Sequence, residues 1–137
     1  MNKRIILVIT IIIILFIVSI LTLKHFSPYE RIKKVVDSLD NAAIMEVNKL
    51  SSEGDFKYET VKIIDDKNII EDIGNIILNG ELIESDAITT PASDYELVFL
   101  DDKNNILLDI GFPGIVINNI IVKISEEESQ KIYQYIK

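Results

Sequence analysis

The side chains of this sequence that could do chemistry are almost all carboxylates. The chain has no cysteine and a single histidine, His25. It therefore lacks thiol nucleophiles, disulfides and the cluster of nitrogen and sulfur ligands that a transition metal needs. Its five glycines are scattered, so no glycine-rich phosphate loop is present. This inventory predicts a protein that is not an enzyme and has no catalytic residues, no cofactor and no metal site.

Adjacent carboxylates are the remaining candidates for acid–base chemistry or calcium binding. Asp65-Asp66 and Glu126-Glu127 each stand where a helix is expected to begin, which explains both pairs as helix caps. Residues 101–105, Asp-Asp-Lys-Asn-Asn, lack the ligand spacing, the glycine and the glutamate of a calcium-binding loop. They predict a hairpin turn instead. A cell-envelope enzyme, or an accessory subunit of one, that uses carboxylates is an alternative function.

The charge of the chain is acidic and unevenly placed. The whole sequence carries a net charge of −8, and leaving out the three cations Lys3, Arg4 and Lys24 gives −11 for the rest. A domain with this charge is expected to bind nucleic acid poorly and to be repelled by anionic lipid headgroups. Its acidic surface either attracts a basic partner, such as a cationic peptide, or serves only solubility.

Residues Ile5–Leu23 form an uncharged, apolar run of nineteen residues. As a helix, the run is about 28 Å long, which matches the hydrocarbon thickness of a bilayer. We therefore predict a helix that spans the lipid bilayer, with interface residues at Lys3, Arg4, Lys24 and Phe26. A cleaved signal peptide is the alternative, although the run is longer than a signal core and lacks a small-x-small cleavage site.

The orientation in the membrane follows from the charges beside the apolar run. Lys3 and Arg4 favour a cytoplasmic tail at residues 1–4. Cations beyond the run, from Lys24 to Lys34, favour the opposite orientation, but long C-terminal domains cross membranes largely regardless of charge. We predict a single-pass protein of the cell membrane whose C-terminal domain is extracytoplasmic. If the segment is cleaved, the same domain is secreted.

Residues 24–42 predict a juxtamembrane helix or linker. Ser27, Pro28 and Glu30 have the types and spacing of a helix start with a capping box. Apolar residues then recur at helical spacing, which predicts a helix from Pro28 to about Asn41. This helix either forms a stalk or packs on the domain that follows.

Residues 43–137 predict a single α+β domain. Phe56 to Ile64 alternates like a strand and favours a hairpin with Ala43 to Leu50, the alternative being a longer first helix. Asp65-Asp66 then caps a helix that has one stripe of isoleucines. Asn79-Gly80 predicts a left-handed stop for that helix.

The second half of the domain predicts a meander of strands and a closing helix. Residues 81–94 predict a loop with a short extended piece at Leu82-Ile83. Asn118-Asn119 is typical of a type I′ turn, and Ser125 with Glu128 forms a capping box that opens the last helix. Strands are expected at residues 95–100, 106–112, 115–117 and 120–124.

The element order is therefore ββα-ββββα, which predicts an antiparallel sheet with two helices packed on one face. The sequence Asp-Asp-Lys-Asn occurs at residues 65–68 before the first of these helices and at 101–104 before a strand. This echo favours two related halves that make one curved sheet.

Several segments carry a resemblance to a known group of proteins. They are the anchor and the stretches DDKNIIEDIGNII, YELVFLDDKNNILLDIG and GIVINNIIVKISEEESQKIYQYI. From residue 43 to 137 the chain resembles small uncharacterised, membrane-anchored extracytoplasmic proteins of Gram-positive bacteria with a domain similar to the TATA-binding protein. The resemblance implies that fold and transfers no catalytic residues.

These features predict a single-pass, membrane-anchored, non-catalytic extracytoplasmic binding or regulatory module. Its partners are the lipid bilayer and either an extracytoplasmic or membrane protein or a cationic peptide. An immunity-type protein that intercepts a toxin or cationic peptide at the membrane is the alternative within this class.

Overall fold

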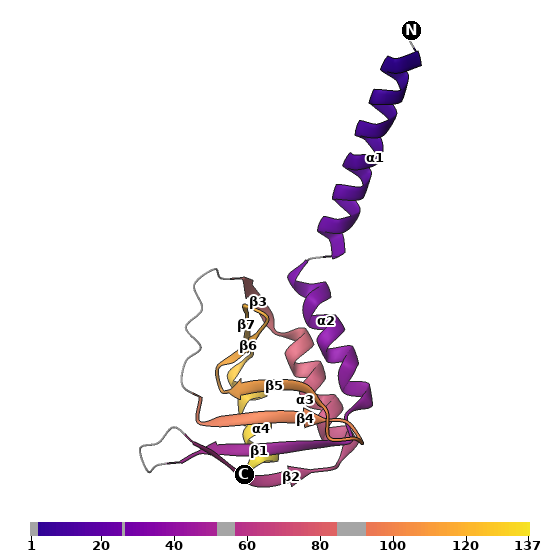
Figure 1. Cartoon of the computed structure of the whole chain (residues 1–137). Helices are drawn as coiled ribbons and strands as arrows, with labels where there is room; N and C mark the ends of the chain where they lie inside the picture. The colour runs from indigo at the N-terminus through magenta and orange to yellow at the C-terminus, as the bar shows by residue number, and fades with distance from the viewer. Residues whose placement is uncertain (1–2, 26, 52–56, 85–92) are drawn as a thin grey trace.

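The computed structural model describes residues 3–25, 27–51, 57–84 and 93–137, and within the first helix it describes the side chains of residues 5–20. A long helix projects from a folded domain in which three helices lie beside antiparallel strands (Figure 1). The elements are α1 (Lys3–His25), α2 (Pro28–Ser38), the 3-10 turn η1 (Leu39–Asn41), β1 (Ile44–Leu50), β2 (Tyr58–Ile64), α3 (Lys67–Asn79), β3 (Glu81–Glu84), β4 (Tyr95–Leu100), β5 (Ile106–Phe112), β6 (Ile115–Ile117), β7 (Ile120–Lys123) and α4 (Glu126–Ile136).

The strands form two antiparallel sheets, one in the order β2-β1-β4-β5 and one in the order β3-β7-β6. The α+β class and the antiparallel pairing are as expected, but the single curved sheet and the order ββα-ββββα are wrong. The four-residue strand β3 follows α3 and pairs with β7, so that Glu81 lies opposite Lys123. A strand of four residues is too short to show a clear alternation of apolar and polar side chains, and its partner cannot be recognised from the sequence alone.

The predicted hairpin is confirmed, because β1 pairs with β2 from Met45 opposite Ile64 to Leu50 opposite Tyr58. The longer first helix is therefore wrong. Residues 52–56, which include the expected start of the second strand, lie outside the described residues. The expected extended piece at Leu82-Ile83 is part of β3, and residues 85–92 also lie outside the description.

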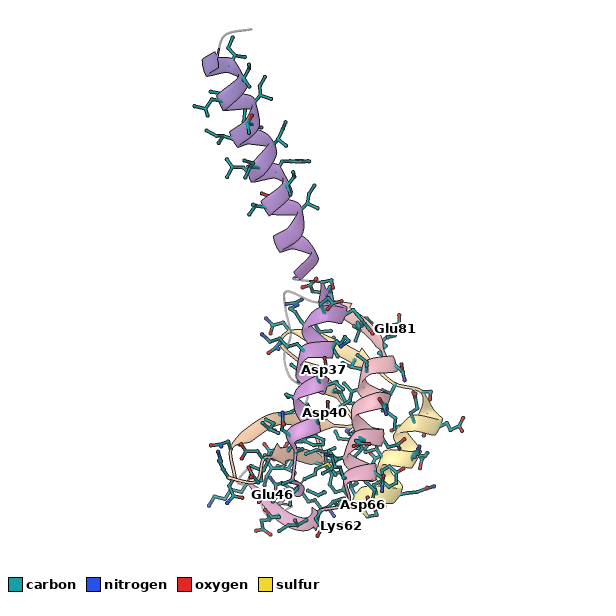
Figure 2. The ribbon with its side chains drawn as sticks, turned by 90° about the vertical axis from the view of Figure 1, so that its right-hand side faces the viewer. Asp37, Asp40, Glu46, Lys62, Asp66 and Glu81 are labelled. Atoms are coloured by element: carbon teal, nitrogen blue, oxygen red, sulfur yellow. The ribbon has the colours of Figure 1, made fainter. Side chains whose placement is uncertain are left out.

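The helices α2, α3 and α4 lie on one side of the four-stranded sheet (Figure 2). The two expected helices, α3 and α4, lie there, and α2 is a third, because of the two arrangements expected for it the helix packs on the domain and is not a stalk. Its Ile32 and the following Leu39 belong to the core. A Cβ on Gly74 of α3 would lie 3.4 Å from side-chain carbons of Leu39 and Val36, so α2 and α3 approach closely.

Alternation decides which strand residues enter the core. Met45 and Val47 of β1 and Leu97 and Phe99 of β4 are fully buried within one apolar cluster. The isoleucine stripe of α3 covers them, as the sequence predicts. At roughly 25 cal/mol per Å² of apolar surface, this burial is the main stabilising contribution to the domain.

Caps and turns largely follow the sequence. Ser125 and Glu128 form both bonds of the capping box of α4. Asn118 and Asn119 have φ angles of 49° and 63°, as a type I′ turn requires. The left-handed stop at Gly80 is wrong, because its φ is −66°. Glycine is needed there for space, since a Cβ would lie 2.5 Å from Val122 Cγ1.

Among the residues that the structure describes, no helix is both long and apolar enough to cross a membrane. The predicted membrane-spanning helix at Ile5–Leu23 is not supported by this measure and stays a prediction. The expected interface residues Lys3, Arg4, Lys24 and Phe26 have side chains outside the description.

Candidate functional site

Helix α1 is apolar on every side and makes no buried contact at residues 5–20. Its large side chains are exposed all round the helix, with 67% of Phe16 and 62% of Leu7 accessible. The helix points away from the domain (Figure 1). The hydroxyls of Thr10 and Ser19 donate back to the carbonyls of Ile6 and Leu15 at 2.9 and 2.8 Å. An apolar surface of this extent is typical of an interaction site.

The second feature is the face of the four-stranded sheet that points away from the helices, which we call the outer face. Strand residues that alternate with the core positions point to this side. Val98 and Leu100 of β4 are on this side of the sheet, because both are buried and yet neither belongs to the core cluster beneath the helices. Ile63 and Ile106 lie on the same face and are 59% and 64% exposed. The face therefore offers apolar surface to solvent.

Two rows of the outer face can be followed across all four strands. In the first, the register places Ile63, Glu46, Val98 and Asp109 side by side, so apolar and acidic residues alternate. In the second, the Asn48 side chain connects its neighbours. Thr60 Oγ1 donates to Asn48 Oδ1 at 2.8 Å, and Asn48 Nδ2 donates to Glu96 Oε2 at 2.8 Å.

The carboxylates of the outer face are not balanced by cations. No lysine or arginine occupies an outward position of these strands within the described residues. Lys62 of β2 points the other way, where its ammonium donates to the Tyr135 carbonyl at the end of α4. Burial, with the charge of Glu96 second, raises the pKa of Asp109. The two carboxylates thus repel one another on a partly desolvated surface.

A pocket of about 500 Å³ lies on the helix side of the sheet, between the end of β1, the start of β4 and the end of α4. Its lining residues are Lys49, Leu50, Ser51, Asp94, Tyr95, Tyr133 and Lys137. The Lys137 ammonium lies 5.0 Å from the ring centre of Tyr133. Burial, followed by the charges of Asp94, Tyr95 and Glu126, raises the pKa of Tyr133. A phenol with a raised pKa stays protonated at neutral pH, so Tyr133 offers the pocket a neutral hydroxyl and an aromatic ring.

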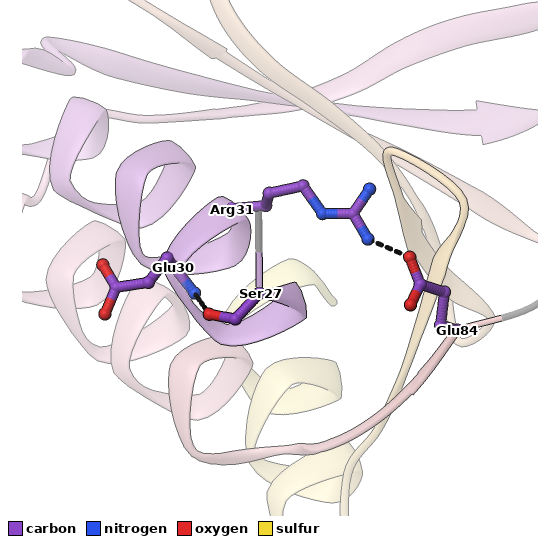
Figure 3. Close-up of polar contacts among 4 residues, drawn as sticks. All are labelled: Ser27, Glu30, Arg31 and Glu84. Carbon is purple, nitrogen blue, oxygen red and sulfur yellow. Dashed lines mark hydrogen bonds and ion pairs between the residues drawn. The ribbon is translucent and has the colours of Figure 1, made fainter. Parts of the chain in front are cut away.

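An ion pair joins α2 to β3. Arg31 Nη2 contacts the Glu84 carboxylate, while the backbone N–H of Glu30 donates to Ser27 Oγ at 3.2 Å (Figure 3). The Arg31 Nε is buried and has no hydrogen-bond partner among the described residues. Only the first bond of the capping box expected at Ser27 and Glu30 is present there. These contacts fix the start of α2 against the domain.

The other chemical candidates of the sequence are structural. Asp66 caps α3, and Asp101 accepts hydrogen bonds from the backbone of Lys103 and Asn105 at 2.8 Å each, which closes the turn. In the described part of the chain, no group of three or more possible ligands is arranged to hold a metal ion. The pockets between the helices and beside β1 contain neither Glu96 nor Asp109.

The sequence reasoning missed the outer face as a site. Its signal was present in part, because outward positions of β1, β4 and β5 hold acidic and apolar residues while most of the intervening ones are apolar core residues. Recognising it required knowledge of which strands are neighbours and which side the helices cover.

Comparison with protein-family models, curated proteins and solved structures finds no match to this chain. The resemblance to membrane-anchored extracytoplasmic proteins therefore stays a prediction.

Proposed function

We propose that this protein is a single-pass membrane protein that holds an acidic, non-catalytic α+β binding module outside the cell. The observation that carries the proposal is the exposure of α1. Every described side chain of its residues 5–20 is accessible, and all but Thr10 and Ser19 are apolar. A helix that is apolar all round requires an apolar environment, and a bilayer provides one.

The sequence around α1 supports the same environment. The uncharged run extends to Leu23, which gives nineteen residues between the cations Arg4 and Lys24. The described hydroxyls of α1, those of Thr10 and Ser19, donate to carbonyls of their own helix, which lowers the cost of placing them in lipid. Lys3 and Arg4 favour a cytoplasmic first segment, so the domain is on the extracytoplasmic side.

The binding role rests on what the domain offers to a partner. It carries a sheet face that none of the described helices covers and an open pocket of about 500 Å³. Asp66 caps α3 and Asp101 accepts hydrogen bonds in a turn, whereas Glu126 and Glu127 lie in the first turn of α4, whose cap is Ser125 with Glu128. A domain with these features is suited to recognition.

Membrane extraction of the full chain tests the anchor. Expressed in bacteria, the protein is expected to stay in the membrane pellet after an alkaline carbonate wash. The double substitution Ile12→Arg/Leu15→Arg should move most of it to the supernatant, because each arginine at the centre of a membrane helix costs about 2.5–3.5 kcal/mol. The matched control Ile12→Leu/Leu15→Ile keeps the apolar character and should stay in the pellet.

Release of the unsubstituted chain by carbonate would overturn the anchor. The orientation is read from protease added to intact spheroplasts, which should digest the domain and leave a short membrane-protected fragment. Complete protection of the domain would place it in the cytoplasm and contradict the proposed topology.

A further inference from the structure

The outer face of the four-stranded sheet is a surface of the domain that none of the described helices covers. The three domain helices lie on the opposite side of this sheet (Figures 1 and 2). Ile63 and Ile106 leave more than half of their surface accessible at its two sides. Between them, Val98 and Leu100 form an apolar floor that does not belong to the core. This arrangement is typical of a docking surface.

The charges on this face restrict what can dock there. Glu46, Glu96 and Asp109 are distributed over three adjacent strands, and the outward strand positions that the structure describes hold no cation. Within the described residues, Glu46 and Asp109 make no side-chain hydrogen bond or ion pair. The register places both in one row, two strands apart, which is about 10 Å. Apolar residues stand between and beside them.

The negative charge of the outer face therefore decides which of several possible binding partners it favours. A second copy of this chain would bring three more carboxylates against the first three, which is unfavourable. An anionic lipid surface is repelled for the same reason. A peptide with lysines or arginines along one side and apolar residues between them would pair with both features of the face.

We propose that the outer face binds a cationic amphipathic peptide segment, with Glu46 and Asp109 pairing its cations and the exposed Ile63 and Ile106 contacting its apolar side chains. This inference rests on the proposed function, because it names the partner of the binding module. It also explains why the module would be anchored in a membrane, because cationic amphipathic peptides concentrate at membrane surfaces. A module held there meets them before or as they reach the lipid.

Binding is tested on the full chain in nanodiscs of phosphatidylcholine, a lipid without net charge. The probe is a labelled lysine–leucine peptide patterned as an amphipathic helix, and the control probe carries glutamate in place of lysine. Fluorescence anisotropy is expected to show saturable binding of the first probe alone, weakening as salt is added. The substitution Glu46→Gln/Asp109→Asn should weaken binding by about tenfold.

A matched variant separates local pairing from the overall charge. Asp40→Asn/Glu71→Gln removes the same two charges from the surface between α2 and α3, and should change affinity less than about twofold. Ile106→Ser should also weaken binding, which electrostatic attraction at a distance would not explain. Equal losses in the two charge variants, or an unchanged affinity for Ile106→Ser, would overturn the proposal.

The failure of this inference is distinguishable from failure of the anchor. Flotation of the full chain with phosphatidylcholine vesicles reports membrane insertion without any peptide. A chain that does not float contradicts the anchor, and the same titration in detergent micelles still tests the outer face. A chain that floats but binds neither probe, or that forms a dimer abolished by Ile106→Ser, overturns the docking proposal alone.

Discussion

Single residues of one type have different tasks in this protein, and their neighbours decide which. Asp66 and Asp101 stand in the same Asp-Asp-Lys-Asn sequence. The Asp66 carboxylate accepts the N–H of Asn68 and starts a helix, whereas the Asp101 carboxylate accepts two backbone N–H groups and closes a turn. Hydrogen bonds from Asn105 hold the pKa of Asp101 below its usual value. Asp109 lacks such donors, and its pKa is raised by burial and by Glu96.

The Asp109 carboxyl gives a prediction at this scale. Because its folded pKa is raised, folding disfavours the charged form, so this group lowers stability increasingly as pH rises through that pKa. Asp109→Asn is therefore expected to raise the melting temperature at neutral pH and to have little effect below the unfolded pKa of about 4. Thermal unfolding of the full chain in detergent micelles measures this, with Asp102→Asn, on an exposed turn, as the control. Destabilisation by Asp109→Asn at neutral pH would contradict the raised pKa.

At the scale of elements, the contact between α3 and α4 depends on one carboxylate. Asp72 of α3 accepts from the Tyr135 hydroxyl at 2.7 Å and pairs with the Lys131 ammonium at 2.7 Å. Both partners lower the pKa of Asp72, Lys131 most strongly. A carboxylate with a lowered folded pKa contributes stability above its unfolded pKa, and this is lost as pH falls through the folded value.

Tyr135→Phe is expected to lower the melting temperature at pH 7 by on the order of 3 °C, through loss of one charge-assisted hydrogen bond. The difference should shrink as the pH falls and Asp72 becomes protonated. Tyr58→Phe is the control, because the Tyr58 hydroxyl donates to the backbone carbonyl of Ser93, which has no ionisable group. Its effect should be the same across that pH range. A Tyr135→Phe effect as large at low pH as at pH 7 would show that the contribution of the hydroxyl does not depend on the charge of Asp72.

Elements with strong local signals could be predicted from the sequence, and those defined by distant partners could not. The isoleucine stripe of α3 and the capping box at Ser125 are local, and both were predicted. Strand β3 exists through its pairing with β7, about forty residues away in sequence. The outer face depends in the same way on β1 lying between β2 and β4. The spacing of Glu46 and Asp109 is therefore invisible until the sheet order is known.

At the scale of the whole molecule, α2 follows the apolar helix and is itself part of the core of the α+β domain. Ile32 is fully buried, Leu39 is 3% exposed, and Arg31 pairs with Glu84 at the end of β3. The charge pair and the buried side chains fix α2 against α3. Helix α2 therefore belongs to the folded domain.

This arrangement predicts where the domain can be cut. A fragment of residues 27–137 is expected to fold, whereas residues 43–137 should not, because the shorter fragment lacks the core residues Ile32, Leu39 and Ala42. Truncation of a buried isoleucine or leucine alone costs about 2–5 kcal/mol. That cost is comparable to the total stability of a domain of this size, about 5–15 kcal/mol. Near-ultraviolet circular dichroism and thermal unfolding compare the two fragments. If residues 43–137 unfold as cooperatively as the longer fragment, α2 is an accessory linker, and the domain does not need its packing in order to fold.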